Sequence, residues 1–74
     1  MKPQHSSSVS LTPRELEILE WMASPNTYKQ IGAQLSVSEE TVRSHAKNIL
    51  EKMKRPNRAQ AVLTAMRIGL IKLS

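Results

Sequence analysis

The sequence predicts an all-α fold, a compact four-helix domain that contains a helix-turn-helix. Three observations support this prediction. Apolar residues recur at helical spacing in four segments, a Ser, Thr or Asn that can cap a helix precedes each segment, and no segment alternates as a strand would. The 74 residues suffice for one domain only, and the absence of cysteine excludes disulfides and thiolate metal sites.

The chain divides into a short tail and one folded unit. Residues 1–10, MKPQHSSSVS, are polar and aperiodic, so we expect a flexible tail or linker there and a domain over residues 11–74. His5 has no second ligand nearby, which argues against a metal site. No apolar run is long enough to span a bilayer or to form a signal peptide, so a cytoplasmic protein is expected.

The first helix is expected in the segment LTPRELEILEWM. Thr12 is a good N-cap, Pro13 suits the first helical position, and Glu15 completes a capping box. Pro25 and Asn26 then favour a break and a turn. The inner face of this helix is expected to comprise Glu15, Ile18, Leu19 and Met22, with Trp21 at its margin.

The second helix is expected to start after Thr27, with Gln30 as the reciprocal partner of that cap. Ile31 and Leu35 are its expected buried pair. Gly32 lies between them, in mid-helix, where glycine costs about 1 kcal/mol relative to alanine. We therefore expect another stretch of backbone to pass close to Gly32.

The third helix follows a break at residues 36–38. Ser38 is its expected cap, and Glu39 and Glu40 lie in its first turn, where negative charge suits the helix dipole. Pro56 ends the helix, and a fourth helix, capped by Asn57 with Gln60, runs to Gly69. The apolar stripe of the third helix comprises Val42, Ile49, Leu50 and Met53, bordered by His45 and Ala46.

The window over residues 28–47 fits the helix-turn-helix template. In that motif two short helices cross steeply through a brief turn, so their backbones meet near Gly32. Val37 is expected to fill the turn, and Val42 to fix the second helix of the motif on the first. The outer face of that second helix then projects beyond the body of the domain.

That outer face is polar and basic where a buried helix would be apolar, with Glu40, Arg43, Ser44 and Lys47 on one side. An α-helix fits the major groove of B-DNA, where Arg or Lys can donate to guanine O6 and N7. We therefore predict double-stranded DNA as the partner, with base contacts from Arg43, Ser44 and Lys47. Glu40 is interpreted as serving the helix dipole. An ordinary solvated helix face is the alternative.

Charge is distributed unevenly, which also favours a polyanionic partner. Residues 1–40 carry three Lys or Arg against five Glu, whereas residues 41–74 carry eight against one. Phosphate contacts are expected to flank the groove-binding helix, in part at the N-terminal amides of the second helix. The candidates for DNA-backbone contacts are Thr27, Tyr28, Lys29, Thr41, Lys54, Arg55 and Arg58.

The fourth helix is apolar on more than one side. Val62, Ala65 and Met66 form one strip, whereas Ala61, Leu63 and Ile68 point elsewhere. One strip must close the core, and the other is either a dimer face or the edge of the core. The predicted homodimer interface consists of Val62, Ala65 and Met66.

Three segments together resemble the LuxR/GerE-type DNA-binding domain of NarL/FixJ response regulators: LTPRELEIL, KQIGAQLSVSEETVRSHAKNILEKM and NRAQAVLTAMRIGLI. The resemblance covers about residues 11–71. It implies a four-helix domain that regulates transcription and binds DNA as a dimer, with the third helix in the major groove and the fourth supplying much of the dimer contact. By position it places base readers at Arg43, Ser44 and Lys47, and backbone contacts at Thr41 and Lys29.

The resemblance also implies a structural or phosphate-facing role for His45, and an N-terminal receiver or ligand-binding domain that controls the module. The sequence departs from the family pattern at Pro25 and Tyr28, where glycine and asparagine are usual. It also departs at Ser36 in the central turn, where glycine is usual, so we expect a positive φ at Ser36.

Two other binding functions remain as alternatives. The promoter-reading end of a sigma factor also resembles the first two segments, but no helix like the fourth is expected there. A helical module that binds an acidic protein is the other alternative. The sequence contains no nucleophile–base pair, metal cluster or phosphate loop, so we do not expect an enzyme or a catalytic residue. We likewise expect no cofactor, metal, small-molecule substrate or membrane partner. RNA polymerase is a further candidate partner, and the expected location is the bacterial nucleoid.

Overall fold

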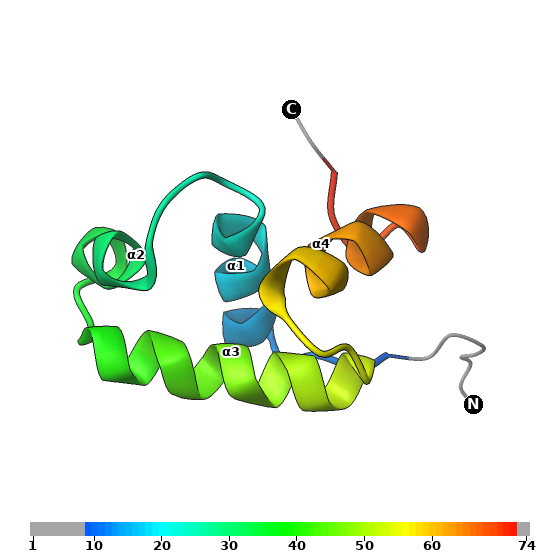
Figure 1. The fold of residues 1–74 in the computed structure, drawn as a ribbon. Helices are drawn as coiled ribbons and strands as arrows, with labels where there is room; N and C mark the ends of the chain where they lie inside the picture. The colour runs from blue at the N-terminus through cyan, green and yellow to red at the C-terminus, as the bar shows by residue number, and fades with distance from the viewer. Residues whose placement is uncertain (1–8, 73–74) are drawn as a thin grey trace.

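The computed structural model describes residues 9–72 and confirms the predicted fold class (Figure 1). It contains four α-helices and, within that range, no strand: α1 (Pro13–Met22), α2 (Tyr28–Leu35), α3 (Glu39–Met53) and α4 (Arg58–Arg67). The predicted tail lies outside the described residues as far as residue 8, and so does His5. Val9 packs against the core, so the folded unit begins slightly before the predicted boundary at Leu11.

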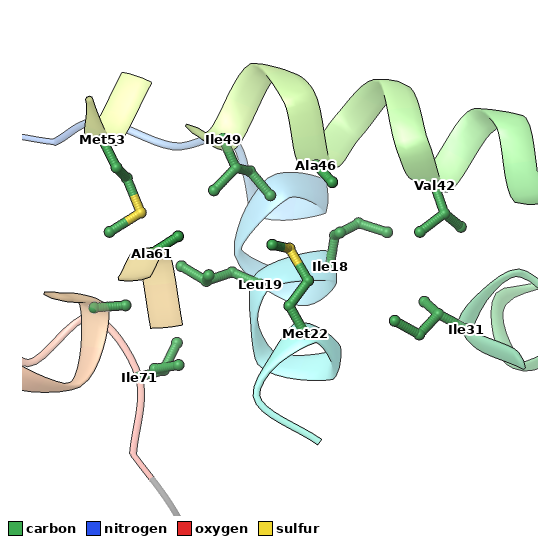
Figure 2. Close-up of a cluster of buried hydrophobic side chains, with 11 residues drawn as sticks. Ile18, Leu19, Met22, Ile31, Val42, Ala46, Ile49, Met53, Ala61 and Ile71 are labelled. Atoms are coloured by element: carbon green, nitrogen blue, oxygen red, sulfur yellow. The ribbon is translucent and has the colours of Figure 1, made fainter. Parts of the chain in front are cut away.

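Helix α3 is the longest element and packs against each of the other three helices (Figure 1). It lies along one side of the molecule, with α2 near its N-terminal end and α4 near its C-terminal end. Figure 2 shows the core between them, where side chains of α1, α2 and α4 meet the inner face of α3. The buried apolar residues are Ile18, Leu19, Met22, Ile31, Val42, Ala46, Ile49, Met53, Ala61, Ala65 and Ile71.

The four helix starts are confirmed at the predicted caps. The side chains of Thr12 and Thr27 each accept a hydrogen bond from the backbone N–H three residues on. The side chains of Glu15 and Gln30 in turn accept from the backbone N–H of the cap residue, which completes two capping boxes. Ser38 and Asn57 cap α3 and α4 through their side chains, which accept from the backbone N–H groups of Thr41 and Gln60 without a reciprocal bond. These bonds satisfy amides that have no partner within a helix. Trp21 packs at the edge of the core, also as predicted.

The corner between α2 and α3 depends on Gly32, as its mid-helix position predicted. A Cβ at this position would lie 2.6 Å from the carbonyl oxygen of Val37, which is backbone and cannot swing aside. The Val37 N–H in turn donates to the Gly32 carbonyl oxygen at 2.9 Å. The turn therefore folds directly back on α2, and Val42 is fully buried beneath it.

Left-handed backbone ends three of the helical segments. Ser36 follows α2 with φ 60°, Lys54 follows α3 with φ 57°, and Gly69 follows α4 with φ 81°. The positive φ at Ser36 was predicted, whereas that at Lys54 was not. A non-glycine residue is disfavoured in this region because its Cβ approaches the following carbonyl. Both Ser36 and Lys54 therefore carry local backbone strain.

Two serines of the central turn are expected to respond oppositely to glycine. Ser36→Gly relieves a left-handed φ and should raise the free energy of unfolding by ~0.5–1 kcal/mol. Ser38→Gly removes the side chain that accepts from the Thr41 N–H at 3.0 Å, and should lower the free energy of unfolding by a few tenths of a kcal/mol. Urea denaturation of both variants measures the difference, and destabilisation by Ser36→Gly would contradict the strain assigned to that residue.

Glu15 is the one buried charged residue of the described chain, only 5 % exposed. Its Oε1 accepts from Lys52 Nζ of α3 at 2.7 Å and from the Thr12 backbone N–H at 3.0 Å. The hydrogen bond from Lys52, together with that from Thr12, lowers the pKa of Glu15 below its ordinary value and outweighs the opposing effect of burial. The ionised carboxylate therefore joins the start of α1 to the last turn of α3.

The lowered pKa of Glu15 predicts acid sensitivity. The folded state holds this carboxylate ionised more strongly than the unfolded state, so its stabilisation is complete above the unfolded pKa of about 4.5 and is lost as pH falls through the lower folded pKa. Glu15→Gln should flatten the fall in the free energy of unfolding over that interval. Glu20→Gln, an exposed site on the same helix, should leave it in place. Denaturation at a series of pH values from 7 to about 2.5 tests this, and an unchanged slope in Glu15→Gln would refute it.

The apolar faces of α4 differ from the prediction. Ala61 and Ala65 both close the core and are fully buried, although they were assigned to different strips. Leu63 and Ile68 are the exposed large apolar residues, at 50 % and 41 %. The reason is that the side of α4 nearest the core carries Ala61 and Ala65, whereas Val62 and Met66 pack only partly buried at its edge. Ala65 is therefore no candidate for a dimer surface.

Candidate nucleic-acid interface

The outer face of α3 is fully accessible because its opposite face closes the core. Val42, Ala46, Ile49 and Met53 are buried and follow one stripe along the helix (Figure 2). The exposed side opposite this stripe carries the predicted groove-facing residues, which are Glu40, Arg43, Ser44 and Lys47. The structure thus brings the three predicted base readers onto one exposed helix face, whose contact with another helix is that of Arg43 with Tyr28 of α2.

Arg43 is held by two neighbours although its side chain is 61 % exposed. Its Nη2 donates to Glu39 Oε2 at 2.7 Å, one turn earlier on α3. Its Cζ also lies 5.7 Å from the centroid of the Tyr28 ring, the distance of a cation–π contact. One donor and one face of the guanidinium are thus engaged, and its other N–H groups remain available.

The start of α2 lies beside the N-terminal half of α3, as the contact between Tyr28 and Arg43 requires. Lys29 is exposed in the first turn of α2, next to amides that favour an anion. Thr27 is exposed as well, but its hydroxyl oxygen already accepts the Gln30 N–H at 3.1 Å. This part of the predicted phosphate-binding set is therefore adjacent to the predicted base readers.

Arg58 has a role other than the DNA-backbone contact predicted for it. Its Nε donates to the carbonyl oxygen of Met22 at 2.9 Å, and its Nη2 donates to those of Ser24 at 3.0 Å and Asn26 at 2.6 Å. The guanidinium also lies 5.1 Å from the centroid of the Tyr28 ring. Arg58 thus fixes the α1–α2 connection to the start of α4, and most of its donors are already used within the fold.

The remaining predicted backbone contacts lie at the two ends of α3. Thr41 is exposed in its first turn, where its hydroxyl is 2.9 Å from that of Ser38. Lys54 and Arg55 are exposed just beyond its last turn. A helix of 15 residues is roughly 22 Å long, so these groups can meet phosphates only at well-separated points along a duplex.

Two contributors to this surface escaped the sequence reasoning. Asn48 is exposed one turn beyond Ser44 on the same face, and an Asn amide can pair with adenine N6 and N7. Its spacing of four residues from Ser44 was the available signal. Glu39, which holds Arg43, was read only as a dipole partner, although a Glu four residues before an Arg is a favourable ion pair on a helix.

The described residues offer neither a metal centre nor a membrane-crossing helix. Nowhere in residues 9–72 do three side chains of the His, Cys, Asp or Glu type gather as a metal site would need. Within the same range every helix is too short or too polar to traverse a bilayer.

Residues 9–65 match the family model described as "Bacterial regulatory proteins, luxR family". The chain belongs to this family. The match includes the whole of α1, α2 and α3 and most of α4, in agreement with the resemblance that the sequence motifs indicated. Members of the luxR family are DNA-binding regulators of transcription. Because the match reaches into α4, it favours the luxR assignment over the promoter-reading end of a sigma factor.

Curated relatives agree with the luxR assignment. The spore germination protein GerE of Bacillus subtilis is 37% identical over 70 residues, which cover 95% of each chain. The transcriptional activator protein SolR of Ralstonia nicotianae is 46% identical over 65 residues, or 88% of this chain and 28% of SolR. The transcriptional regulatory protein DegU of Brevibacillus brevis is 40% identical over 72 residues, or 97% of this chain and 29% of DegU.

A solved structure shows the same luxR-family fold. The structure titled "Structure of Transcription factor, GerE" aligns with a TM-score of 0.80 at 39% identity and covers 86% of this chain and 96% of that one. The chain thus spans nearly all of GerE but less than a third of SolR and DegU. In those longer relatives the luxR-type domain is one part of a larger protein.

Proposed function

We propose that this luxR-family domain binds double-stranded DNA sequence-specifically, with α3 in the major groove, and thereby regulates transcription. The observation that carries the proposal is the exposed polar and basic face of α3, which the tight corner at Gly32 holds away from the core. Family membership supports the same function.

The proposed base contacts come from Arg43, Ser44 and Lys47. Arg43 and Lys47 can each donate to guanine O6 and N7, and Ser44 can pair with any base or with phosphate. All three side chains are exposed on the same face of α3. Glu40, in the first turn, stabilises the helix start through its charge.

The proposed phosphate contacts flank this face and set the register of the domain on the duplex. One group lies at the start of α2 and of α3, and the other follows the end of α3. The set comprises Thr27, Tyr28, Lys29, Thr41, Lys54 and Arg55. Arg58 is omitted, because three carbonyl oxygens, at the end of α1 and in the α1–α2 connection, already accept hydrogen bonds from its guanidinium.

The proposed homodimer on DNA uses the outer side of α4. Val62 and Met66 are half-buried, and Leu63 beside them is exposed, so an apolar surface remains open there. Two-fold symmetry would place two half-sites about 10 bp apart on one face of the duplex. Leu63 replaces Ala65 in the interface, because Ala65 belongs to the core.

The proposed setting is the output end of a cytoplasmic regulator, such as a two-component response regulator, acting at the nucleoid with RNA polymerase as a further partner. The small share of SolR and DegU that this chain spans supports a role as one module of a longer protein. GerE, which the chain spans almost completely, shows that the module also matches a protein of its own size.

Selection of bound duplexes from a random pool tests DNA binding, symmetry and spacing together. We expect an enriched palindromic site whose half-sites are separated by about one helical turn. Enrichment of an asymmetric site, or of half-sites out of phase with the helical repeat, would overturn the dimer. Failure to enrich any sequence, with salt-insensitive binding, would overturn DNA binding itself.

Two alanine variants separate base reading from phosphate binding. Arg43→Ala should weaken binding to the selected site by ~1–3 kcal/mol and relax the base preference at one position. Lys29→Ala should weaken binding to all sequences alike and reduce the salt dependence, because a phosphate contact carries no sequence information. Titrations on selected and random duplexes at several salt concentrations measure both effects. Equal losses on the two duplexes for Arg43→Ala would refute its base-reading role.

A further inference from the structure

The Tyr28 ring contacts two guanidinium groups, one fixed and one exposed. The Cζ atoms of Arg58 and Arg43 lie 5.1 Å and 5.7 Å from the centroid of its ring. The first of these, Arg58, is held by three carbonyl oxygens, one at the end of α1 and two in the α1–α2 connection. The second, Arg43, belongs to the outer face of α3. The half-buried ring therefore connects the rigid body of the domain to the side chain proposed to read a base.

Arg43 is the proposed base reader whose position the fold restrains. A free Arg side chain has several rotatable bonds, and ordering them on binding costs free energy. Glu39 on α3 and Tyr28 on α2 restrict the Arg43 guanidinium from two different helices, by an ion pair at 2.7 Å and a cation–π contact. The donors left free still suffice to pair with guanine O6 and N7.

We propose that Tyr28 is a specificity-determining residue, whose ring holds the Arg43 guanidinium in the conformation that meets the base. This inference rests on the proposed DNA-binding function and adds to it a role for an α2 side chain that touches no base. The ring acts through its π face, independently of any phosphate contact by the Tyr28 hydroxyl. Arg58 anchors the ring, because its own guanidinium cannot move without breaking three hydrogen bonds.

Two variants of Tyr28 separate the ring from the hydroxyl. Tyr28→Phe keeps the π face and removes the hydroxyl, whereas Tyr28→Leu keeps an apolar side chain and removes the π face. An exposed cation–π contact is worth a factor of about 2 to 5 in an equilibrium constant. We expect Tyr28→Leu to lower the ratio of affinities for selected and random duplex by about that factor, and Tyr28→Phe to retain it.

A double-mutant cycle assigns the effect to Arg43. In an Arg43→Ala background, Tyr28→Leu should leave the ratio of affinities unchanged, because the side chain that the ring holds is gone. A loss of equal size in that background, or an equal loss on both duplexes in the Arg43 background, would overturn the inference. It would instead assign Tyr28 to the fold or to phosphate binding.

An NMR measurement without DNA provides an independent readout. The Arg43 Nε–Hε signal should carry a ring-current shift that Tyr28→Phe retains and Tyr28→Leu abolishes. If the shift disappears in Tyr28→Leu while the ratio of affinities is unchanged, the proposed role of Tyr28 in specificity is wrong. Arg43→Ala can still confirm, independently, that Arg43 contacts a base. If the wild-type domain prefers no duplex, the proposed function fails and this inference fails with it.

Discussion

Gly32→Val is expected to lower the free energy of unfolding by roughly 3 kcal/mol or more, a large part of the ~4–11 kcal/mol typical of a domain this size. The reason is the 2.6 Å that would separate any Cβ at residue 32 from the Val37 carbonyl oxygen. The oxygen belongs to the backbone and the Cβ is fixed by the backbone that bears it, so the crossing of α2 and α3 must open. Gly32→Ala should show a smaller loss, ~1–3 kcal/mol, because only the Cβ is added.

The matched control for Gly32 is the next residue. Ala33 is exposed on the same helix, so Ala33→Val tests the helix propensity of valine without the corner and should cost well under 1 kcal/mol. Thermal unfolding is sensitive enough, since 1 kcal/mol shifts the Tm of a small domain by roughly 4–8 °C. Similar losses for the two valine variants would contradict the close approach. Because the corner presents α3, Gly32→Val should also weaken binding to every duplex.

Arg58→Ala is expected to lower the free energy of unfolding by ~2–4 kcal/mol. It removes three charged hydrogen bonds to carbonyl oxygens and the contact with Tyr28. Hydrogen bonds to charged groups contribute ~1.5–3 kcal/mol each in mutational series. The total is smaller than their sum, because the partly buried carbonyls can accept water once the arginine is gone.

Arg55→Ala is the control for Arg58, since Arg55 is exposed three residues earlier. Arg55→Ala should change the free energy of unfolding by less than about 0.5 kcal/mol but weaken binding to every duplex. Arg58→Ala should lower the free energy of unfolding but leave binding to random duplex unchanged at temperatures where the variant remains folded. Arg58→Lys should restore little, because an ammonium cannot span three carbonyl oxygens as a planar guanidinium does. Urea denaturation and duplex titration of the three variants decide the matter. Full stability of Arg58→Ala would return Arg58 to the phosphate-binding set.

The exposure of the predicted base readers follows from helical periodicity. The stripe of Val42, Ile49 and Met53 determines one side of α3, and therefore places Arg43 and Lys47 on the other side. Helical periodicity does not predict which Lys or Arg side chains form hydrogen bonds within the fold. Arg55 and Arg58 looked equivalent in sequence, yet one remains exposed and the other binds a connection more than 30 residues away.

The apolar strips of α4 show a second limit. Val62, Ala65 and Met66 look continuous on a helical wheel, but whether a strip is core or surface depends on how closely the neighbouring helices approach. The structure buries the small residues Ala61 and Ala65 and leaves Leu63 exposed, the reverse of what side-chain size alone favours. Only the position of α4 against α1 and α3 decides this.

The sequence by itself determined the helix starts, the corner at Gly32 and the outer face of α3. Caps and periodicity act over three or four residues, within one turn of helix, so local chemistry is sufficient for them. The tertiary structure alone decided the contacts of Arg58 with the α1–α2 connection, of Tyr28 with Arg43, and of Glu15 with Lys52. Those contacts join different helices, and they exist only because packing of the apolar core brings the helices to fixed positions.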